Sequence, residues 1–146
     1  MSDAIGPAYF FEDLHVGMEA SLVHTVAAQD VRDFARISGD VNPIHLDEAY
    51  AKQTQFRRTI AHGLLTASYI SAVFGSKLPG PGCIYISQTL NFKAPIHAGD
   101  EVTATVRISS LIEHRKRAIF NCQCTVGEKT VLEGEAVLLV PSRAAK

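Results

Sequence analysis

The sequence lacks long hydrophobic runs and an excess of charge of either sign. No stretch reaches the roughly 18–20 apolar residues of a membrane-spanning helix. Fourteen Lys and Arg against 15 Asp and Glu give a net charge of −1, which excludes a basic nucleic-acid-binding domain. The first 17 residues contain neither Lys nor Arg, so the basic region of a signal peptide is missing. We therefore expect a cytoplasmic protein without nucleic-acid or membrane partners.

Cysteine is also scarce. The three cysteines, Cys83, Cys122 and Cys124, form no CxxC motif. Cys122 and Cys124 would share one face of a strand, and free cysteines are often buried, so we expect reduced core thiols. A disulfide or a zinc site is the alternative. The six histidines form no HxxxH pair, and phosphate-binding or dinucleotide-binding glycine motifs are absent. The sequence predicts no metal and no cofactor.

What is present fits one globular domain over residues 1–146, with an irregular arm at 1–16. Hydrophobic residues make up 47% and charged residues 20%, which is ordinary for a folded domain. The patterns predict a short strand at 20–27 and a helix at 28–37 that ends at Gly39. Asp47 is typical of an N-cap, here for a helix at 48–54.

The second half of the chain changes character. Residues 64–77 are apolar nearly all round, which predicts a helix buried on every side. After the Pro- and Gly-rich break at 78–82, apolar and polar residues alternate. This pattern predicts an antiparallel meander, with strands at 84–93, 102–109, 118–126 and 130–140.

A central apolar helix needs a wall around it, and a curved antiparallel sheet supplies one. The sequence therefore predicts an α+β fold, a single hot-dog domain in which the sheet wraps around a buried helix. The open edges of such a sheet favour pairing with a second copy, so we expect a homodimer.

The densest polar segment runs from Ser38 to His45, SGDVNPIH. A turn stiffened by Pro43 can bring Asp40 and His45 together, and such a pair can hold a water molecule for acid–base catalysis. Alternatively, Asp40 and Asn42 merely bond the backbone of the turn.

A second candidate feature opens the apolar helix, at Ala61-His62-Gly63. Free N–H groups at a helix N-terminus suit an oxygen that gains negative charge, and Gly63 allows close approach. A plain helix start with a packed His62 is the alternative. Farther along, Ser71 points the same way as Leu64 at the helix start, although hydroxyls in buried helices often bond their own backbone.

Three segments together resemble the MaoC-like hydratases: SGDVNPIH, AHGLL at 61–65, and NFKAPIHAGD at 91–100. Within that family the chain is most similar to the (R)-specific enoyl-CoA hydratases that feed polyhydroxyalkanoate synthesis. The resemblance extends from about residue 17 to 140, and its motifs occur in the family's order. Residues 1–16 lie outside it.

The resemblance implies a hot-dog dimer that adds water to a trans-2-enoyl-CoA, giving (R)-3-hydroxyacyl-CoA. By position, Asp40 and His45 would be the catalytic pair, and Asn42 would hold the loop. The Gly63 N–H, with His62 beside it, would bind the thioester oxygen. Ser71 would line the acyl pocket.

The remaining expectations concern the two ends of the substrate. The CoA phosphates need basic side chains, and Lys93, Arg57 and Arg58 are the candidates. Phe74 follows Ser71 in the acyl pocket, and its bulk favours short or medium acyl chains.

Three other functions fit parts of the same pattern. One is a 3-hydroxyacyl-[acyl-carrier-protein] dehydratase on the same fold. Another is a non-catalytic acyl-CoA-binding module, which would have lost the Asp or the His. A hot-dog thioesterase would carry its carboxylate on or beside the central helix, and residues 64–77 contain neither Asp nor Glu.

Overall fold

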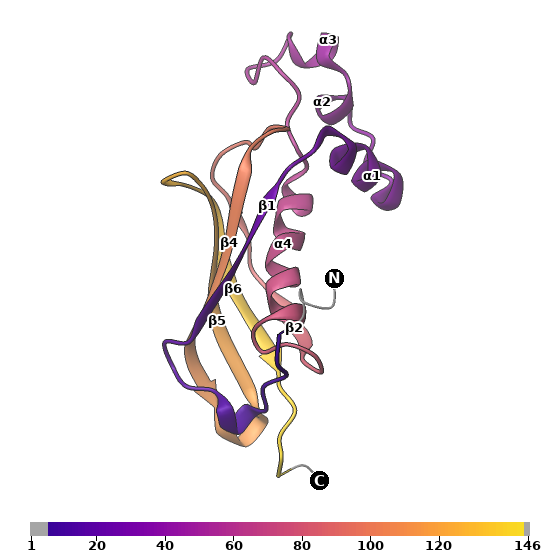
Figure 1. The fold of residues 1–146 in the computed structure, drawn as a ribbon. Coiled ribbons are helices and arrows are strands. Elements are labelled where there is room, and N and C mark those ends of the chain that lie inside the picture. Colours follow the sequence, from indigo (N-terminus) through magenta and orange to yellow (C-terminus); the bar gives the residue numbers. More distant parts are fainter. Residues whose placement is uncertain (1–5, 145–146) are drawn as a thin grey trace.

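The computed structural model describes residues 6–144, which form one antiparallel sheet with a long helix along one face (Figure 1). The sheet runs in the order β1-β4-β5-β6-β2, and β3 pairs with β6 as well. This confirms the α+β hot-dog prediction. The strands are β1 (Glu19–Thr25), β2 (Ile84–Gln88), β3 (Asn91–Phe92), β4 (Glu101–Ile112), β5 (Arg117–Val126) and β6 (Lys129–Leu139).

Three short helices lie beyond one end of the sheet, and the long helix α4 begins near them (Figure 1). The helices are α1 (Ala28–Ser38), α2 (Pro43–Leu46), α3 (Glu48–Ala51) and α4 (Gly63–Ser76), and single 3-10 turns occupy Phe11–Asp13 and Glu113–Arg115. Among the residues described, no helix is long and apolar enough to cross a bilayer.

The helix boundaries follow local chemistry. Gly39 ends α1 in the left-handed conformation, with φ of 86°, as its position predicts. Asp47 caps α3 by accepting a hydrogen bond from the Tyr50 N–H at 3.1 Å. The helix expected at 48–54 stops at Ala51, because the Thr54 hydroxyl donates to the Ala51 carbonyl at 2.7 Å and closes a turn there.

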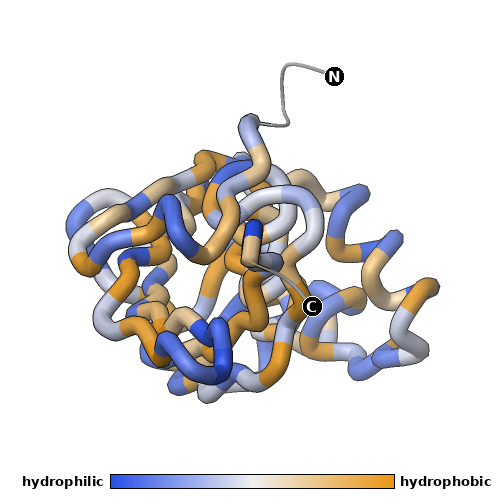
Figure 2. The backbone as a smooth tube through the Cα atoms, turned by 90° about the horizontal axis from the view of Figure 1, so that it is seen from below, coloured by the Kyte–Doolittle hydropathy of each residue, from blue (hydrophilic) through white to orange (hydrophobic). Residues whose placement is uncertain are grey.

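The core lies between α4 and the inner face of β4 and β5, where every second residue is buried. This confirms the predicted alternation. Figure 2 colours the backbone by hydropathy, and hydrophobic and hydrophilic residues are interspersed along it. Cys122 and Cys124 are free thiols in this core, and burial raises the pKa of Cys122 to about 11 and that of Cys124 to about 12. The fully or nearly fully buried residues of the two strands are Val102, Ala104, Val106, Ile108, Ala118, Phe120, Cys122 and Cys124.

The strand predicted at 84–93 is wrong as a single element, because the chain breaks into β2 and β3 at Thr89. The Thr89 carbonyl presses against Gly134 of β6, where an added Cβ would come within 1.8 Å of that oxygen. The Thr89 hydroxyl also accepts a hydrogen bond from the Glu135 N–H at 2.9 Å, in place of a main-chain partner. This close crossing interrupts the regular ladder.

The meander is right for β4, β5 and β6 but wrong for β2, which pairs with β6 instead of β4. The connection from 93 to 100 is too long for a hairpin and contains Pro95, so it carries the chain across the end of the sheet. Its end is tied to β1 by the Val26 N–H, which donates to the Asp100 carbonyl at 2.9 Å.

Helix α4 is not buried on every side in the single chain. Leu65, Ile70 and Val73 face the sheet and are buried, whereas the opposite face is open. The sheet curves around one side of the helix only, and no other described element covers the other side. The exposed positions of this open face are Leu64, Ser68, Ser71, Ala72 and Gly75.

The two chain ends close the C-terminal end of α4. The Gly6 N–H donates to the Ser76 carbonyl at 2.6 Å, and the Phe11 N–H donates to the Pro141 carbonyl at 2.7 Å. Glu12 accepts hydrogen bonds from the Ser142 hydroxyl and from the Arg143 N–H. The predicted arm therefore packs onto the domain from Gly6 onward, and residues 1–5 of the arm lie outside the described residues.

Candidate active site

The polar segment between α1 and α2 folds into a turn that the side chains of its own residues hold together. Asp40 Oδ1 accepts a hydrogen bond from the Asn42 N–H at 3.2 Å. Asn42 Oδ1 in turn accepts from the Ile44 N–H at 3.1 Å and caps α2, whose first residue is Pro43. Asp40 therefore uses one carboxylate oxygen for the turn and leaves the other, Oδ2, for another partner.

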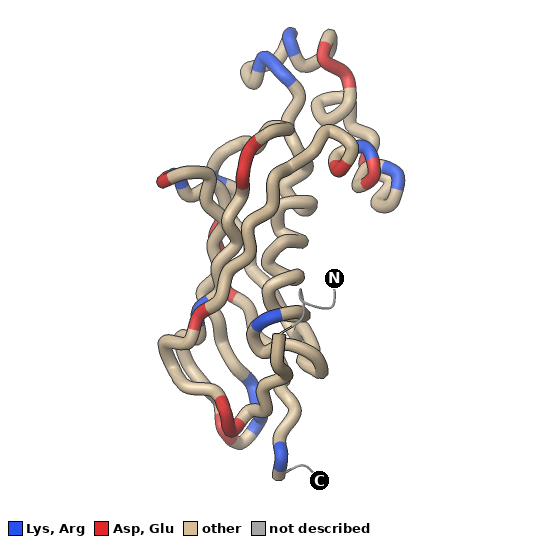
Figure 3. The backbone as a smooth tube through the Cα atoms, in the orientation of Figure 1, with Lys and Arg blue, Asp and Glu red and all other residues tan. Residues whose placement is uncertain are grey.

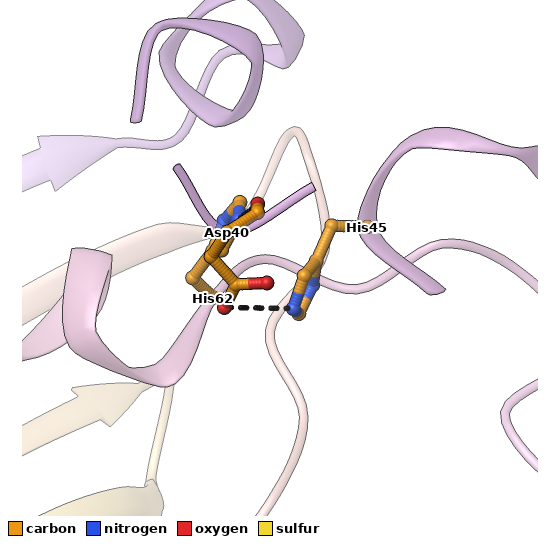
Figure 4. Close-up of side chains that lie close together, drawn as sticks. All are labelled: Asp40, His45 and His62. Atoms are coloured by element: carbon orange, nitrogen blue, oxygen red, sulfur yellow. Dashed lines mark hydrogen bonds and ion pairs between the residues drawn. The ribbon is translucent and has the colours of Figure 1, made fainter. Parts of the chain in front are cut away.

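That partner is His45. Its Nε2 lies 4.0 Å from Asp40 Oδ2 (Figure 4). The other ring nitrogen, Nδ1, lies 2.8 Å from the carbonyl oxygen of Ile60. A carbonyl can only accept, so Nδ1 carries the proton of the neutral ring and Nε2 keeps its lone pair. The main chain thus fixes the tautomer that presents a basic nitrogen beside the carboxylate.

His62 supports this pair from the start of α4. It is buried, with 2% exposure, and its Nε2 donates to the main-chain carbonyl of Asp40 at 2.9 Å. Its ring stacks on the His45 ring at a centroid distance of 3.8 Å (Figure 4). His62 therefore ties the Asp40 turn and the His45 ring to the N-terminus of the long helix.

The first N–H groups of α4 are free for a ligand. Within residues 6–144, the main-chain N–H of Gly63 and that of Leu64 have no acceptor. Unpaired N–H groups at the start of a 14-residue helix carry a partial positive charge. They suit a carbonyl oxygen that becomes more negative during a reaction.

A cavity of about 470 Å³ joins these groups. Its polar lining residues are Asp40, His45, His62, Thr66 and the half-exposed Lys93, and Gly63 lines it as well. The remainder is predominantly apolar, which suits a hydrocarbon chain next to a small reacting centre. Its apolar lining comes from Phe56, Ile60, Ala61, Leu64, Phe92, Ala94, Pro95, Ile96, Val131 and Leu132.

Asp40, His45 and His62 also place three possible metal-ligand atoms within 4.8 Å of one another. The two imidazole planes are stacked at 25° to each other, however. Ring nitrogens bind metals in the plane of the ring, so the lone pairs of two stacked rings run side by side and do not converge on one ion. The arrangement suits proton transfer better than metal binding.

The structure separates the other expected site residues from this cavity. Ser71 lines a second, shallow groove of about 300 Å³ between α4 and β2. Phe74 is fully buried, packed edge-on against Phe120 at a centroid distance of 4.8 Å. Arg57 and Arg58 are exposed on the loop after α3, where basic residues gather (Figure 3).

Sequence reasoning missed two contributors to the site. One is the Ile60 carbonyl that orients His45, a main-chain group that no residue pattern reveals. The other is Phe92, which alternation assigned to the apolar face of a strand together with Ile84 and Ile86. Its position beside Lys93, in a segment already singled out, was the available signal.

Proteins similar in sequence to this chain are named as hydratases or dehydratases of CoA esters. Residues 14–132 match the model of the MaoC-like domain. The chain is 50% identical over 135 residues to an (R)-specific enoyl-CoA hydratase of Rhodospirillum rubrum, a match covering 92% of this chain and 94% of that protein. It is 52% identical over 134 residues to a 3-hydroxybutyryl-CoA dehydratase of Methylorubrum extorquens, covering 92% of this chain and 85% of that one.

Among solved structures, the (R)-hydratase of Aeromonas caviae involved in polyhydroxyalkanoate biosynthesis superimposes with a TM-score of 0.86 at 43% identity, over 89% of this chain and 99% of that one. Fold and relatives together define a hot-dog enzyme of the hydro-lyase class. Within that class, the chain belongs to the MaoC-like domain family.

Proposed function

We propose that this protein is an (R)-specific trans-2-enoyl-CoA hydratase that uses Asp40 and His45 as its acid–base pair. The observation that carries the proposal is the fixed tautomer of His45. Its basic Nε2 faces the free Asp40 oxygen at 4.0 Å, in the same cavity as the unpaired Gly63 N–H. The stereochemistry and the CoA ester come from the relatives, which carry those words in their names.

The reaction needs three things from the chain. A water molecule held by Asp40 and His45 loses a proton to the pair while its oxygen bonds to C3 of the enoyl group. The electrons of the double bond move toward the thioester oxygen, which the Gly63 N–H stabilises. The pair then passes that proton to C2 as the electrons return from the thioester oxygen to form the C–H bond, so that water is added across the double bond without a covalent enzyme intermediate.

The substrate would enter with its CoA portion across the exposed basic residues. Lys93 lies at the cavity edge, paired with Glu133 at 3.3 Å. Arg57 and Arg58 are exposed on the loop after α3 and would bind further phosphates of the CoA. The acyl chain would run along the open face of α4 toward the groove that contains Ser71.

A second copy of the chain would complete this path. Among residues 6–144, no strand pairs with the outer edge of β2, and Ile84, Tyr85 and Ile86 are exposed there. An exposed apolar edge beside an uncovered helix face favours a symmetric dimer. A monomeric mass by light scattering would contradict this part of the proposal.

The test is loss of the enoyl-thioester absorbance when crotonyl-CoA meets the purified protein, followed by chiral analysis of the product. Rapid loss and an (R)-3-hydroxy product support the proposal. No reaction with crotonyl-CoA but turnover of the same acyl group on acyl-carrier protein would favour the carrier-protein dehydratase. Binding without turnover of either would favour the acyl-CoA-binding module.

Two finer points extend the proposal. The 3-hydroxyacyl part of the product is the repeating unit of polyhydroxyalkanoates, and the (R)-hydratase of Aeromonas caviae is involved in polyhydroxyalkanoate biosynthesis. The preference for short or medium chains is also proposed, although Phe74 does not line the 470 Å³ cavity. Equal turnover of crotonyl-CoA and dodecenoyl-CoA would contradict that preference.

A further inference from the structure

The aromatic ring of Phe92 occupies the place where residue 63 would carry a side chain. A Cβ added to Gly63 would lie 2.6 Å from Phe92 Cε1, 2.7 Å from Cδ1 and 3.2 Å from Cζ. These distances are far inside van der Waals contact, so the ring lies flush against the Gly63 Cα. The glycine at this position is therefore matched to an aromatic ring from another part of the chain.

The backbone around Phe92 is fixed on both sides. Before it, the Thr89 N–H donates to the Glu135 carbonyl at 2.8 Å, and the Thr89 carbonyl abuts Gly134. After it, the Lys93 N–H donates to the Val131 carbonyl at 2.8 Å. The break between β2 and β3 thus sets the position from which this ring reaches α4.

Phe92 is nevertheless 55% exposed, although it lines the cavity that contains Asp40 and His45. A large apolar side chain held half in solvent by a rigid backbone contributes less to burial than a core phenylalanine does. Its contact with the helix start is specific, because it covers the residue whose N–H is free.

We propose that Phe92 is a positioning residue for the thioester. Its ring keeps water from the flank of Gly63 and limits the directions from which the thioester oxygen can reach the Gly63 N–H. A shielded N–H stabilises developing charge more strongly than one in water. This inference rests on the proposed hydratase function and assigns a residue outside the Asp40–His45 pair to it.

The experiment is a double-mutant cycle measured with crotonyl-CoA. Phe92→Ala should lower kcat by about 10- to 100-fold with a smaller change in KM, since loss of positioning acts on the transition state. Gly63→Ala should lose more, because its methyl group and the ring cannot occupy the same space. In Gly63→Ala/Phe92→Ala the methyl group partly fills the vacated space, so kcat should exceed that of Gly63→Ala alone.

A matched control is Phe10→Ala, which removes a phenylalanine that is 36% exposed from the arm, where it contacts Arg143. This variant should keep the wild-type kcat. Two kinetic results would overturn the inference: a kcat for Phe92→Ala within twofold of wild type, or losses that simply multiply in the double variant. A change in oligomeric mass for Phe92→Ala would likewise overturn it, assigning the ring to a subunit contact.

The outcome separates this inference from the function itself. A wild-type protein that does not hydrate crotonyl-CoA contradicts the proposed function, and the positioning role with it. A wild-type protein that hydrates while Phe92→Ala matches it contradicts the positioning role alone.

Discussion

The two ends of helix α4 are built for different purposes. At the C-terminal end, the arm and the tail close over the helix with main-chain hydrogen bonds and the Glu12 contacts. At the N-terminal end, the Gly63 N–H is unpaired within residues 6–144, and polar side chains face a cavity. Substitutions at the closed end should therefore change stability, and substitutions at the open end should change activity.

The largest expected effect is at the open end. Asp40→Asn and His45→Gln should each lower kcat by about 10²–10⁴-fold, the usual contribution of an acid–base group. Asparagine keeps the oxygen that accepts from the Asn42 N–H, so the turn should survive and the free energy of unfolding should change by less than about 1 kcal/mol. Kinetics with crotonyl-CoA and urea unfolding measure both. If Asp40→Asn instead lowered the free energy of unfolding by much more than about 1 kcal/mol, the loss of kcat would be explained by damage to the turn, and Asp40 would serve only the turn.

A substitution at the closed end should have the opposite effect, a loss of stability without a loss of activity. Phe11 is 3% exposed and anchors the arm to the tail. Phe11→Ala should lower the free energy of unfolding by about 3–5 kcal/mol, the usual cost of removing a buried phenyl ring. The kcat of the folded fraction should not change. A large drop in kcat at temperatures where the variant is folded would break the separation of the two ends.

Acid should weaken the closed end through Glu12. The Ser142 hydroxyl and then the Arg143 N–H lower the pKa of Glu12 from 4.5 to about 2. A depressed pKa contributes stability that is fully present above pH 4.5 and is lost as the pH falls toward 2. The stability difference between wild type and Glu12→Gln should therefore shrink over that window. Urea unfolding at a series of pH values measures it, and a constant difference would contradict the assignment.

The smallest expected effect concerns the cavity edge. Glu133 pairs with Lys93, and both side chains are about half exposed. If Lys93 binds the CoA phosphates as proposed, Glu133 would compete with them. Glu133→Gln should lower KM for crotonyl-CoA by a factor of about 2–5, because exposed ion pairs contribute up to about 1 kcal/mol. Lys93→Gln should raise KM instead. Changes of the same sign in both variants would remove Lys93 from the CoA path.

Periodic features were the most predictable from sequence. Residues 102–108 and 118–124 alternate clearly, and the buried core followed from them. Alternation did not predict the break between β2 and β3. At this break the Thr89 hydroxyl replaces a main-chain acceptor, and such a replacement leaves no trace in the pattern of apolar and polar residues. The same holds for strand order, since the pairing of β2 with β6 depends on the long connection at 93–100.

For the site, the residues with special chemistry were predictable, and their supports were not. Spacing and turn chemistry predicted that Asp40 and His45 lie close together, and in the structure Asp40 Oδ2 and His45 Nε2 are 4.0 Å apart. The contact of Phe92 with Gly63 joins segments about thirty residues apart, which no local pattern encodes. Ser71 lies on the open face of α4 and Phe74 lies in the core. Their expected roles in the acyl pocket remain predictions.

The contact between His45 and the main chain has a consequence for how this enzyme could be altered. Ile60 is tied at both main-chain groups: its N–H donates to the Ile44 carbonyl at 3.1 Å, and its carbonyl accepts from His45. Ile60 is also one of the residues that line the cavity. Under the proposed function, replacing the side chain of Ile60 would reshape the space for the acyl group while leaving the main-chain contact that orients His45 intact. Position 60 is therefore a natural starting point for library screens that seek new substrates without losing turnover.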